Sequence, residues 1–225
     1  MLGSMIVDHF KPNFYSTDGK FVIAAIADTL LTKLIYGEWR SDEKSLELYQ
    51  SRFQYYFNEY QQLSADIQLK SWFQAAMVPV GLSADSIDEA QLESRRCLEA
   101  MGVAPDRFLE GEILAALIFL GKEGVDKEAI PYFLQSEYQL AISKLPPTLE
   151  LNIRSLLDCG NFEAYLKEAC VYNDPSYLMM CGGLGQVFYN RLPAFLVDPM
   201  LDCLEEDIKA MILSFLKSFN CLPSW

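Results

Sequence analysis

Apolar residues recur at intervals of three and four along most of the chain, and this spacing places them on one face of an α-helix. The first such stretch runs from Asp18 through Leu34 and Ile35. Gly37 follows it, at the position where a left-handed C-terminal cap would lie. The pattern therefore predicts a buried helix that Gly37 ends.

Two more helices are predicted before residue 80. Ser41 precedes the segment 42–63, whose first turn is acidic, as the positive end of a helix dipole prefers. Ser64 is a candidate cap for a third helix. We expect Pro79 to end that helix, because proline lacks the backbone N–H that the next turn needs.

A fourth helix is predicted over 83–102. It begins with serine and aspartate, directs Leu92 and other apolar residues inward, and stops at Gly102. Its opposite face is acidic. A fifth is predicted from Phe108 to Leu120, after a Pro-Asp pair, and it is apolar on nearly all sides. Such a helix belongs at the centre of a bundle.

The rest of the chain continues the helical pattern. Further helices are predicted over 126–145, 148–158, 161–172, 176–191 and 199–219. Alternation of the strand type, bounded by hairpin turns, is nowhere convincing. We therefore predict an all-α fold, a single-domain multi-helix bundle of about eight to ten helices over 18–225, preceded by an N-terminal segment, 1–17. Residues 1–4 are interpreted as a candidate cloning remnant without a role in the fold.

Composition and net charge limit the kinds of molecule that the protein is expected to bind. The chain of 225 residues is 51% hydrophobic, enough for one sizeable core. It has 31 acidic and 18 basic residues, a net charge of −13, which disfavours nucleic acid and anionic membranes and favours a basic partner. No apolar run approaches the roughly 18 residues of a membrane span, and no signal segment is evident. We expect a cytoplasmic protein without membrane insertion.

The six cysteines form no close pair of the CxxC type, which favours reduced thiols. Cys159, Cys170 and Cys181 recur every eleven residues, either as a metal-ligand array or as helix positions that take small buried side chains. We favour the second interpretation and expect no metal, because His9 is the only histidine.

The usual catalytic constellations are missing. A single histidine cannot supply a di-iron carboxylate bundle and makes a nucleophile–histidine arrangement improbable. The Cys181–Gly185 segment is glycine-rich but lacks the preceding strand and the Gly-Lys-Ser/Thr ending of a phosphate loop. We interpret these glycines as sites of close helix packing or of a helix kink. We predict a protein that is not an enzyme and uses no cofactor.

Two short motifs suggest a family. Glu59-Tyr60-Gln61-Gln62-Leu63 ends the second predicted helix, and Pro105-Asp106-Arg107-Phe108 precedes the fifth. In this arrangement the chain resembles the TorD/DmsD/NarJ-like redox-enzyme maturation chaperones, although Arg107 stands where that family has histidine. The resemblance implies an all-α chaperone that binds the twin-arginine signal peptide of a molybdoenzyme precursor. It also implies that Tyr60, Asp106 and Glu112 lie near a peptide groove.

The residues point to a similar partner without the resemblance. A peptide with arginines and an apolar run requires carboxylates beside a hydrophobic groove. We expect this groove to be floored by the helix 108–120. The candidate carboxylates are Asp85, Asp88, Glu89, Asp106, Glu110 and Glu112.

Two alternatives stay open. In the first alternative, each of these carboxylates is an ordinary solvated surface residue. The rival function is an acidic immunity or inhibitor protein that binds a basic toxin or another basic partner, which needs the charge but no apolar groove.

Overall fold

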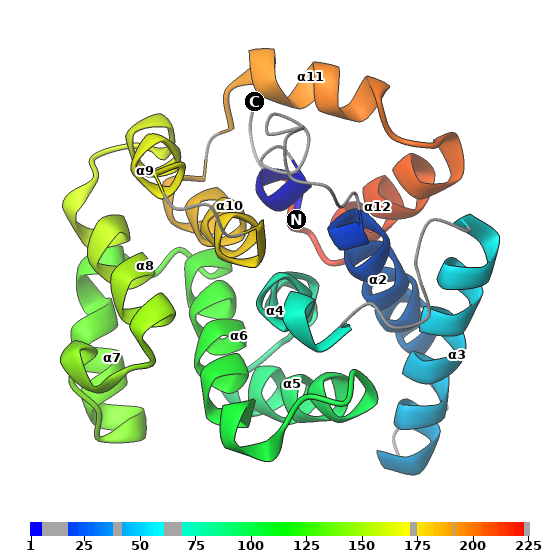
Figure 1. Cartoon of the computed structure of the whole chain (residues 1–225), viewed down its shortest axis with the longest axis horizontal. Coiled ribbons are helices and arrows are strands. Elements are labelled where there is room, and N and C mark those ends of the chain that lie inside the picture. Colours follow the sequence, from blue (N-terminus) through cyan, green and yellow to red (C-terminus); the bar gives the residue numbers. More distant parts are fainter. Residues whose placement is uncertain (6–17, 38–41, 61–68, 172–174, 191, 223–225) are drawn as a thin grey trace.

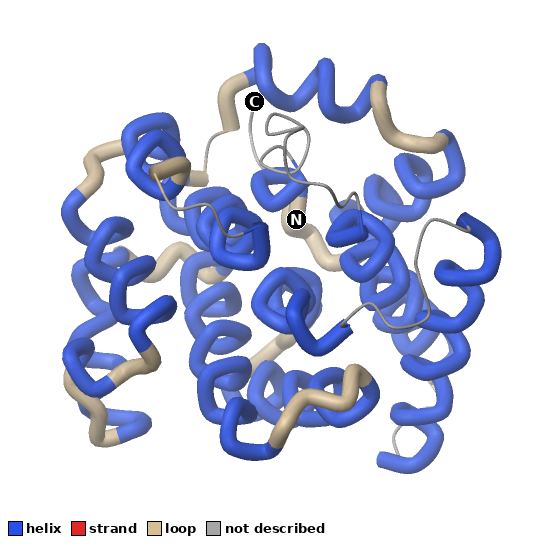
Figure 2. The backbone as a smooth tube through the Cα atoms, in the orientation of Figure 1, coloured by secondary structure: helices blue, strands red, loops and turns tan. Residues whose placement is uncertain are grey.

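The computed structural model describes residues 1–5, 18–37, 42–60, 69–171, 175–190 and 192–222 (Figure 1). Within these ranges the chain forms twelve α-helical segments, counting one turn at residues 2–5, and four short 3₁₀ turns. No strand occurs among them (Figure 2). The predicted all-α fold is confirmed, with slightly more helices than expected.

The first two long helices follow the prediction closely. Helix α2 (Asp18–Tyr36) is closed by Gly37, whose φ is +62° and whose N–H donates to the carbonyl of Lys33 at 3.0 Å. Only glycine adopts this φ without strain, so the predicted cap is confirmed. Helix α3 (Asp42–Tyr60) packs beside α2. The last turn of α2 was expected to be buried but exposes Leu34 and Ile35.

The centre of the molecule is built around α4 (Phe73–Ser83), which follows the 3₁₀ turn η1 (Leu69–Trp72). It packs against α2, α5, α6 and α10 (Figure 1). The expectation that Pro79 ends this helix is wrong, because α4 continues to Ser83. A proline inside a helix costs one backbone hydrogen bond, and dense packing on several sides offsets that loss. The cap predicted at Ser64 lies outside the described residues.

Helices α5 (Ile87–Ala100) and α6 (Phe108–Lys122) are joined through the 3₁₀ turn η2 (Pro105–Arg107). Helix α6 is buried from Glu110 to Ile118, as its apolar sequence predicted. Helix α5 begins at Ile87, four residues after the predicted start at residue 83. Leu92 was expected to face inward, but 47% of it is exposed, and this difference matters for the site described below.

The second half of the chain contains more breaks than expected. Its elements are η3 (Lys127–Ala129), α7 (Ile130–Tyr138), η4 (Ile142–Lys144), α8 (Pro147–Asp158), α9 (Phe162–Ala169), α10 (Pro175–Tyr189), α11 (Ala194–Asp202) and α12 (Glu206–Ser218). Helix α10 packs on α4, α6, α8 and α9, whereas α12 returns to α2 (Figure 1).

Two of the predicted helices are each divided in the structure. The segment 126–145 breaks at Gln139, which adopts a left-handed φ of 56° and ends α7. The N–H of Leu140 then donates to the carbonyl of Leu134 at 3.1 Å, and such a bond closes a helix end. The segment 199–219 divides between α11 and α12. The helical spacing of apolar residues continues across both breaks, so this spacing alone could not predict where the helices are interrupted.

The glycines of α10 mark close packing, as predicted. A Cβ atom on Gly182 would clash with the carbonyl of Gly3, and one on Gly183 would clash with the side chain of Val78 on α4. The interpretation of residues 1–4 as having no role in the fold is wrong. Met1 and Leu2 are buried, and the N–H of Gly3 donates to Oε1 of Gln186 on α10 at 3.0 Å.

Candidate functional site

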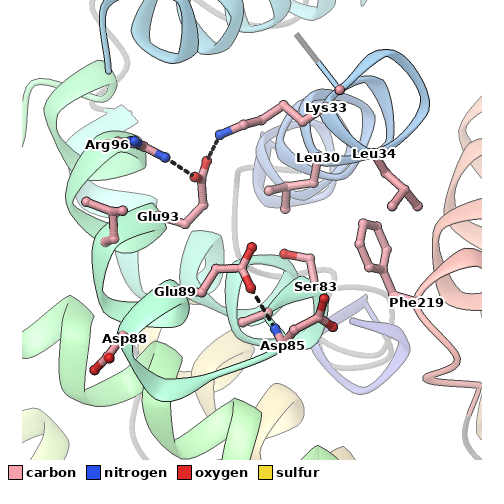
Figure 3. A pocket seen from close by; sticks show the side chains of 13 residues that line it. Leu30, Lys33, Leu34, Ser83, Asp85, Asp88, Glu89, Glu93, Arg96 and Phe219 are labelled. Carbon is pink, nitrogen blue, oxygen red and sulfur yellow. Dashed lines mark hydrogen bonds and ion pairs between the residues drawn. The ribbon is translucent and has the colours of Figure 1, made fainter. Parts of the chain in front are cut away.

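A cavity of about 580 Å³ opens between the last turns of α2 and the first turns of α5 (Figure 3). Its volume lies within the range of about 300–1,000 Å³ that is typical of ligand pockets. The residues that line it are Leu30, Lys33, Leu34, Gly37, Ser83, Ala84, Asp85, Asp88, Glu89, Leu92, Glu93, Arg96 and Phe219. The cavity combines an apolar wall with charged residues, and each part has a distinct structural origin.

The apolar wall comes from three elements. Leu34 ends the apolar stripe of α2, Leu92 lies on α5, and Phe219 follows α12. The side chains of Leu34 and Phe219 lie next to each other on the same side of the cavity (Figure 3). Leu34 is 54% exposed and Leu92 47% exposed, so this wall holds apolar surface that the fold itself does not bury. Burial of such surface by a partner would be favourable.

The acidic side of the cavity is the N-terminus of α5. Ser86 caps this helix by accepting a hydrogen bond from the N–H of Glu89 at 3.1 Å. Oε2 of Glu89 in turn accepts a hydrogen bond from the N–H of Asp85 at 2.9 Å. Glu89 and Asp85 point into the cavity, whereas Asp88 lies at its edge and points away (Figure 3). The helix dipole favours carboxylates at this end, which explains why the fold tolerates three of them together.

The basic residues of the cavity are already paired inside the fold. Glu93, only 7% exposed, lies 2.5 Å from Nζ of Lys33 and 3.2 Å from Nη1 of Arg96. The hydroxyl of Tyr49 also donates to Glu93 at 2.7 Å. Burial raises the pKa of Tyr49 well above its usual value, and the Glu93 anion adds to the rise, so the phenol stays a donor.

The charge that the cavity leaves unpaired is therefore negative. Arg96 has a second carboxylate partner, Asp42, at 2.5 Å. By contrast, no described residue forms a hydrogen bond or an ion pair with the carboxylates of Asp85 or Asp88. An incoming cation would find acceptors here, whereas an incoming anion would compete with pairs already made.

Glu110, one of the predicted site residues, is buried and satisfied within the fold. It lies 2.8 Å from Nη2 of Arg107 and accepts a hydrogen bond from Nε2 of Gln74 at 2.7 Å. Arg107 also places its guanidinium over the ring of Phe73. Glu110 thus anchors the turn η2 against α4 and does not line the cavity.

Glu112 is likewise buried, in a two-point ion pair with Arg95. The Nε–Oε1 distance is 2.5 Å and the Nη2–Oε2 distance is 3.1 Å. Arg95 precedes Arg96 on α5, and successive helical residues point about 100° apart. Glu112 therefore lies on a different face of α5 from the cavity, whose wall includes Arg96.

The cavity between α2 and α5 is not the predicted groove, in which six carboxylates lie above a floor made by 108–120. Helix α6 contributes no lining residue to the cavity. Asp106 is exposed on η2, away from that lining. Tyr60 is the last residue of α3, and its side chain lies outside the described part of the chain. The structure brings together only Asp85, Asp88 and Glu89 of the predicted set.

The described residues contain no group of three or more histidine, cysteine, aspartate or glutamate side chains placed to hold a metal. The three evenly spaced cysteines have different surroundings. Cys181 is buried and accepts a hydrogen bond from Nδ2 of Asn152 at 2.8 Å. Cys159 is half-buried and donates to Oε2 of Glu168 at 3.1 Å, and Cys170 is exposed. His9 lies outside the described residues.

Comparison of the chain with protein-family models, with curated proteins and with solved structures finds no match in any of the three. In the described part of the chain, no helix has both the length and the apolar character needed to cross a membrane.

Sequence reasoning missed Leu34, Glu93 and Phe219 as site residues and assigned Leu92 to the core. One signal was available. Leu34, Ile35 and Tyr36 are consecutive large apolar residues directly before the cap at Gly37. Three successive positions span about 200° of a helix, so one core cannot cover all of them.

Proposed function

We propose that this protein is a non-enzymatic chaperone that holds a basic, partly apolar segment of another protein in the cavity between α2 and α5. One observation carries the proposal: Lys33 and Arg96 are ion-paired within the fold, whereas the carboxylate of Asp85, which points into the cavity, has no partner among the described residues. The exposed leucines Leu34 and Leu92 line the same cavity. The cavity therefore suits a ligand that supplies both a positive charge and an apolar side chain.

A peptide segment that carries cationic side chains next to large apolar ones has both properties. The net charge of −13 would attract it from a distance, and the cavity would then select it at close range. The resemblance of the Glu59–Leu63 and Pro105–Phe108 motifs to redox-enzyme maturation chaperones suggests a specific candidate. It is the twin-arginine signal peptide of a molybdenum-containing oxidoreductase precursor, held in the cytoplasm during assembly.

The rival, an acidic immunity or inhibitor protein, accounts for the charge but not for the cavity. A folded basic partner would meet the surface through exposed carboxylates and would not require Leu34 and Leu92 beside them. The half-exposed leucines therefore favour a peptide over a folded basic protein as the partner.

Calorimetric titration tests the proposal. The protein is titrated with a twin-arginine signal peptide and with a scrambled peptide of the same composition. We expect the ordered peptide to bind more tightly, and we expect added salt to weaken binding without abolishing it, because apolar contacts are not screened. Equal affinity for both peptides would leave only non-specific attraction and would reject the chaperone proposal.

A matched pair of variants tests whether the cavity is the binding site. Leu92 lines the cavity and is 47% exposed, whereas Leu109 lies on α6 outside it and is 46% exposed. Leu92→Ser should weaken peptide binding roughly five- to tenfold, the loss expected for one apolar contact. Leu109→Ser should leave binding unchanged. If both variants bind like the unmodified protein, the peptide binds elsewhere.

A further inference from the structure

A second cavity, of about 230 Å³, lies where the last turns of α6 and α10 meet the segment that follows α12. Its polar groups are the side chains of Lys122, Gln186, Asn190, Asn220 and Cys221. Among the described residues that line it, none is an aspartate or a glutamate. Pockets for drug-sized ligands have volumes of roughly 300–1,000 Å³, so this smaller cavity suits a molecule of a few non-hydrogen atoms.

Gln186 of α10 supplies a buried hydrogen-bond donor that the fold leaves unused. Only 2% of this residue is exposed. Its Oε1 accepts hydrogen bonds from the amino group of Met1 at 2.8 Å and from the N–H of Gly3 at 3.0 Å. Its amide nitrogen, by contrast, has no partner among the described residues. Because an unpaired buried amide is costly and Gln186 lines the cavity, an acceptor bound there would satisfy this nitrogen.

The ammonium of Lys122 adds a positive charge to the same lining. Its Nζ donates to the carbonyl of Ala84 at 2.7 Å and lies 3.8 Å from Oε1 of Glu123, a half-exposed carboxylate. An ammonium has three N–H donors, so one remains for a further acceptor. Burial raises the pKa of Cys221 to about 11, and the charge of Lys122 acts in the opposite direction. Lys122 therefore lies within electrostatic reach of the Cys221 sulfur.

We infer that this cavity binds a short-chain carboxylate, with the carboxylate group held by Lys122 and Gln186 and the alkyl part against Leu82 and Val187. An ionised carboxylate presents only acceptors, which match these two donors, and its hydrogen bond to an ammonium is charge-assisted. Leu82 and Val187 are buried apolar residues of the lining. None of these four residues lines the cavity between α2 and α5, so this site is separate from the one proposed for the peptide.

Protection of Cys221 from alkylation measures the occupancy of the cavity, because Cys221 belongs to the lining. The whole protein is treated with iodoacetamide at pH 9, where more of the thiol is in its reactive thiolate form. The reaction is run with sodium propionate and with sodium chloride at the same ionic strength, and labelling is followed by peptide mass spectrometry. Propionamide, which has the same shape without the charge, is the ligand control. The exposed Cys203 is the internal control.

We expect propionate to bind with a dissociation constant of about 1 mM, which is within the limit for a ligand of five non-hydrogen atoms. Propionate at about 10 mM should then slow the labelling of Cys221 roughly tenfold. The labelling rate of Cys203 should not change, and propionamide should protect Cys221 much less than propionate does. If propionate gives no protection, or if propionamide protects equally well, the inference is wrong.

Variants test the role of charge in the cavity, and each is compared with and without propionate so that changes in thiol reactivity cancel. Lys122→Met should weaken propionate binding at least about tenfold, because it removes the cation and keeps the chain length. Lys144→Met, an exposed change outside the cavity, should have no effect.

Asn220→Asp keeps the test decisive if Lys122→Met does not fold. Asn220 is exposed and has a left-handed φ of 51°, a conformation that aspartate also adopts. The substitution places a carboxylate in the lining, so it should weaken propionate binding by repulsion. Unchanged affinity for propionate in Asn220→Asp, or in a folded Lys122→Met, would contradict the site.

Discussion

The Nζ atom of Lys33 lies 2.5 Å from Oε1 of Glu93 in the wall of the cavity, so one buried carboxylate joins α2 to α5. Glu93→Gln leaves Lys33 and Arg96 without the anion that they share. We expect the variant to lower the free energy of unfolding by roughly 3 kcal/mol, measured by urea denaturation. Glu99→Gln, an exposed change on the same helix, is the control. A loss no larger than that of the control would contradict the role of Glu93.

Charge reversal should have different effects at two of the predicted site residues, Glu112 and Asp106. Glu112 is buried against Arg95, so Glu112→Lys places two cations together and leaves a charge unpaired. We expect a loss of more than about 3 kcal/mol in unfolding free energy. Asp106→Lys, at an exposed position, should stay within about 0.5 kcal/mol of the unmodified protein. Thermal unfolding of the two variants side by side distinguishes these outcomes, and similar melting temperatures would argue against the buried pair.

Gly81 permits close contact between α4 and α6. A Cβ atom there would clash with the carbonyl of Ala115 and with the side chain of Ile118. Gly81→Ala should therefore destabilise the protein by about 1–3 kcal/mol, the range for overpacking a core. Gly160→Ala is the matched control, because a Cβ atom at Gly160 meets nothing within 4 Å. Equal stability of the two variants in denaturant would mean that the helices do not approach as described.

The thiol of Cys159 should react slowly with alkylating reagents at pH 8. Burial, followed by the neighbouring Glu168 carboxylate, raises its pKa to about 11. Since only the thiolate reacts, its labelling rate should rise about tenfold per pH unit until the pH approaches that value. Glu168→Gln removes the negative charge, lowers the pKa and should accelerate labelling at pH 8, as followed by peptide mass spectrometry. The exposed Cys203 provides the internal control, and its rate should not change.

Helix positions were more predictable than the site, for a physical reason. The apolar period and the cap at Gly37 are local features, and local features specify where α2 and α6 lie. The break at Gln139 depends on a left-handed residue that carries no glycine signal, so the period alone could not locate it. Pro79 is tolerated within α4 because of tertiary packing, which the local sequence does not contain.

In the candidate site, too, the features set by the local sequence were predictable and those set by tertiary contacts were not. The acidic start of α5 was recognisable from Asp85, Asp88 and Glu89, because the helix dipole favours such residues there. Whether a carboxylate faces an internal arginine or an open cavity depends on neighbours distant in sequence. Glu110 and Glu112 resembled the others in sequence, yet Arg107 and Arg95 pair with them inside the fold.

The neighbouring arginines of α5 have a consequence for how a partner would be received. Arg95 joins α5 to Glu112 of α6, while Arg96 joins it to Asp42 at the start of α3. Rotation of α5 to widen or narrow the cavity would strain both connections at once. The wall is therefore set before a partner arrives, and the loss of conformational entropy on binding would fall mainly on the incoming segment.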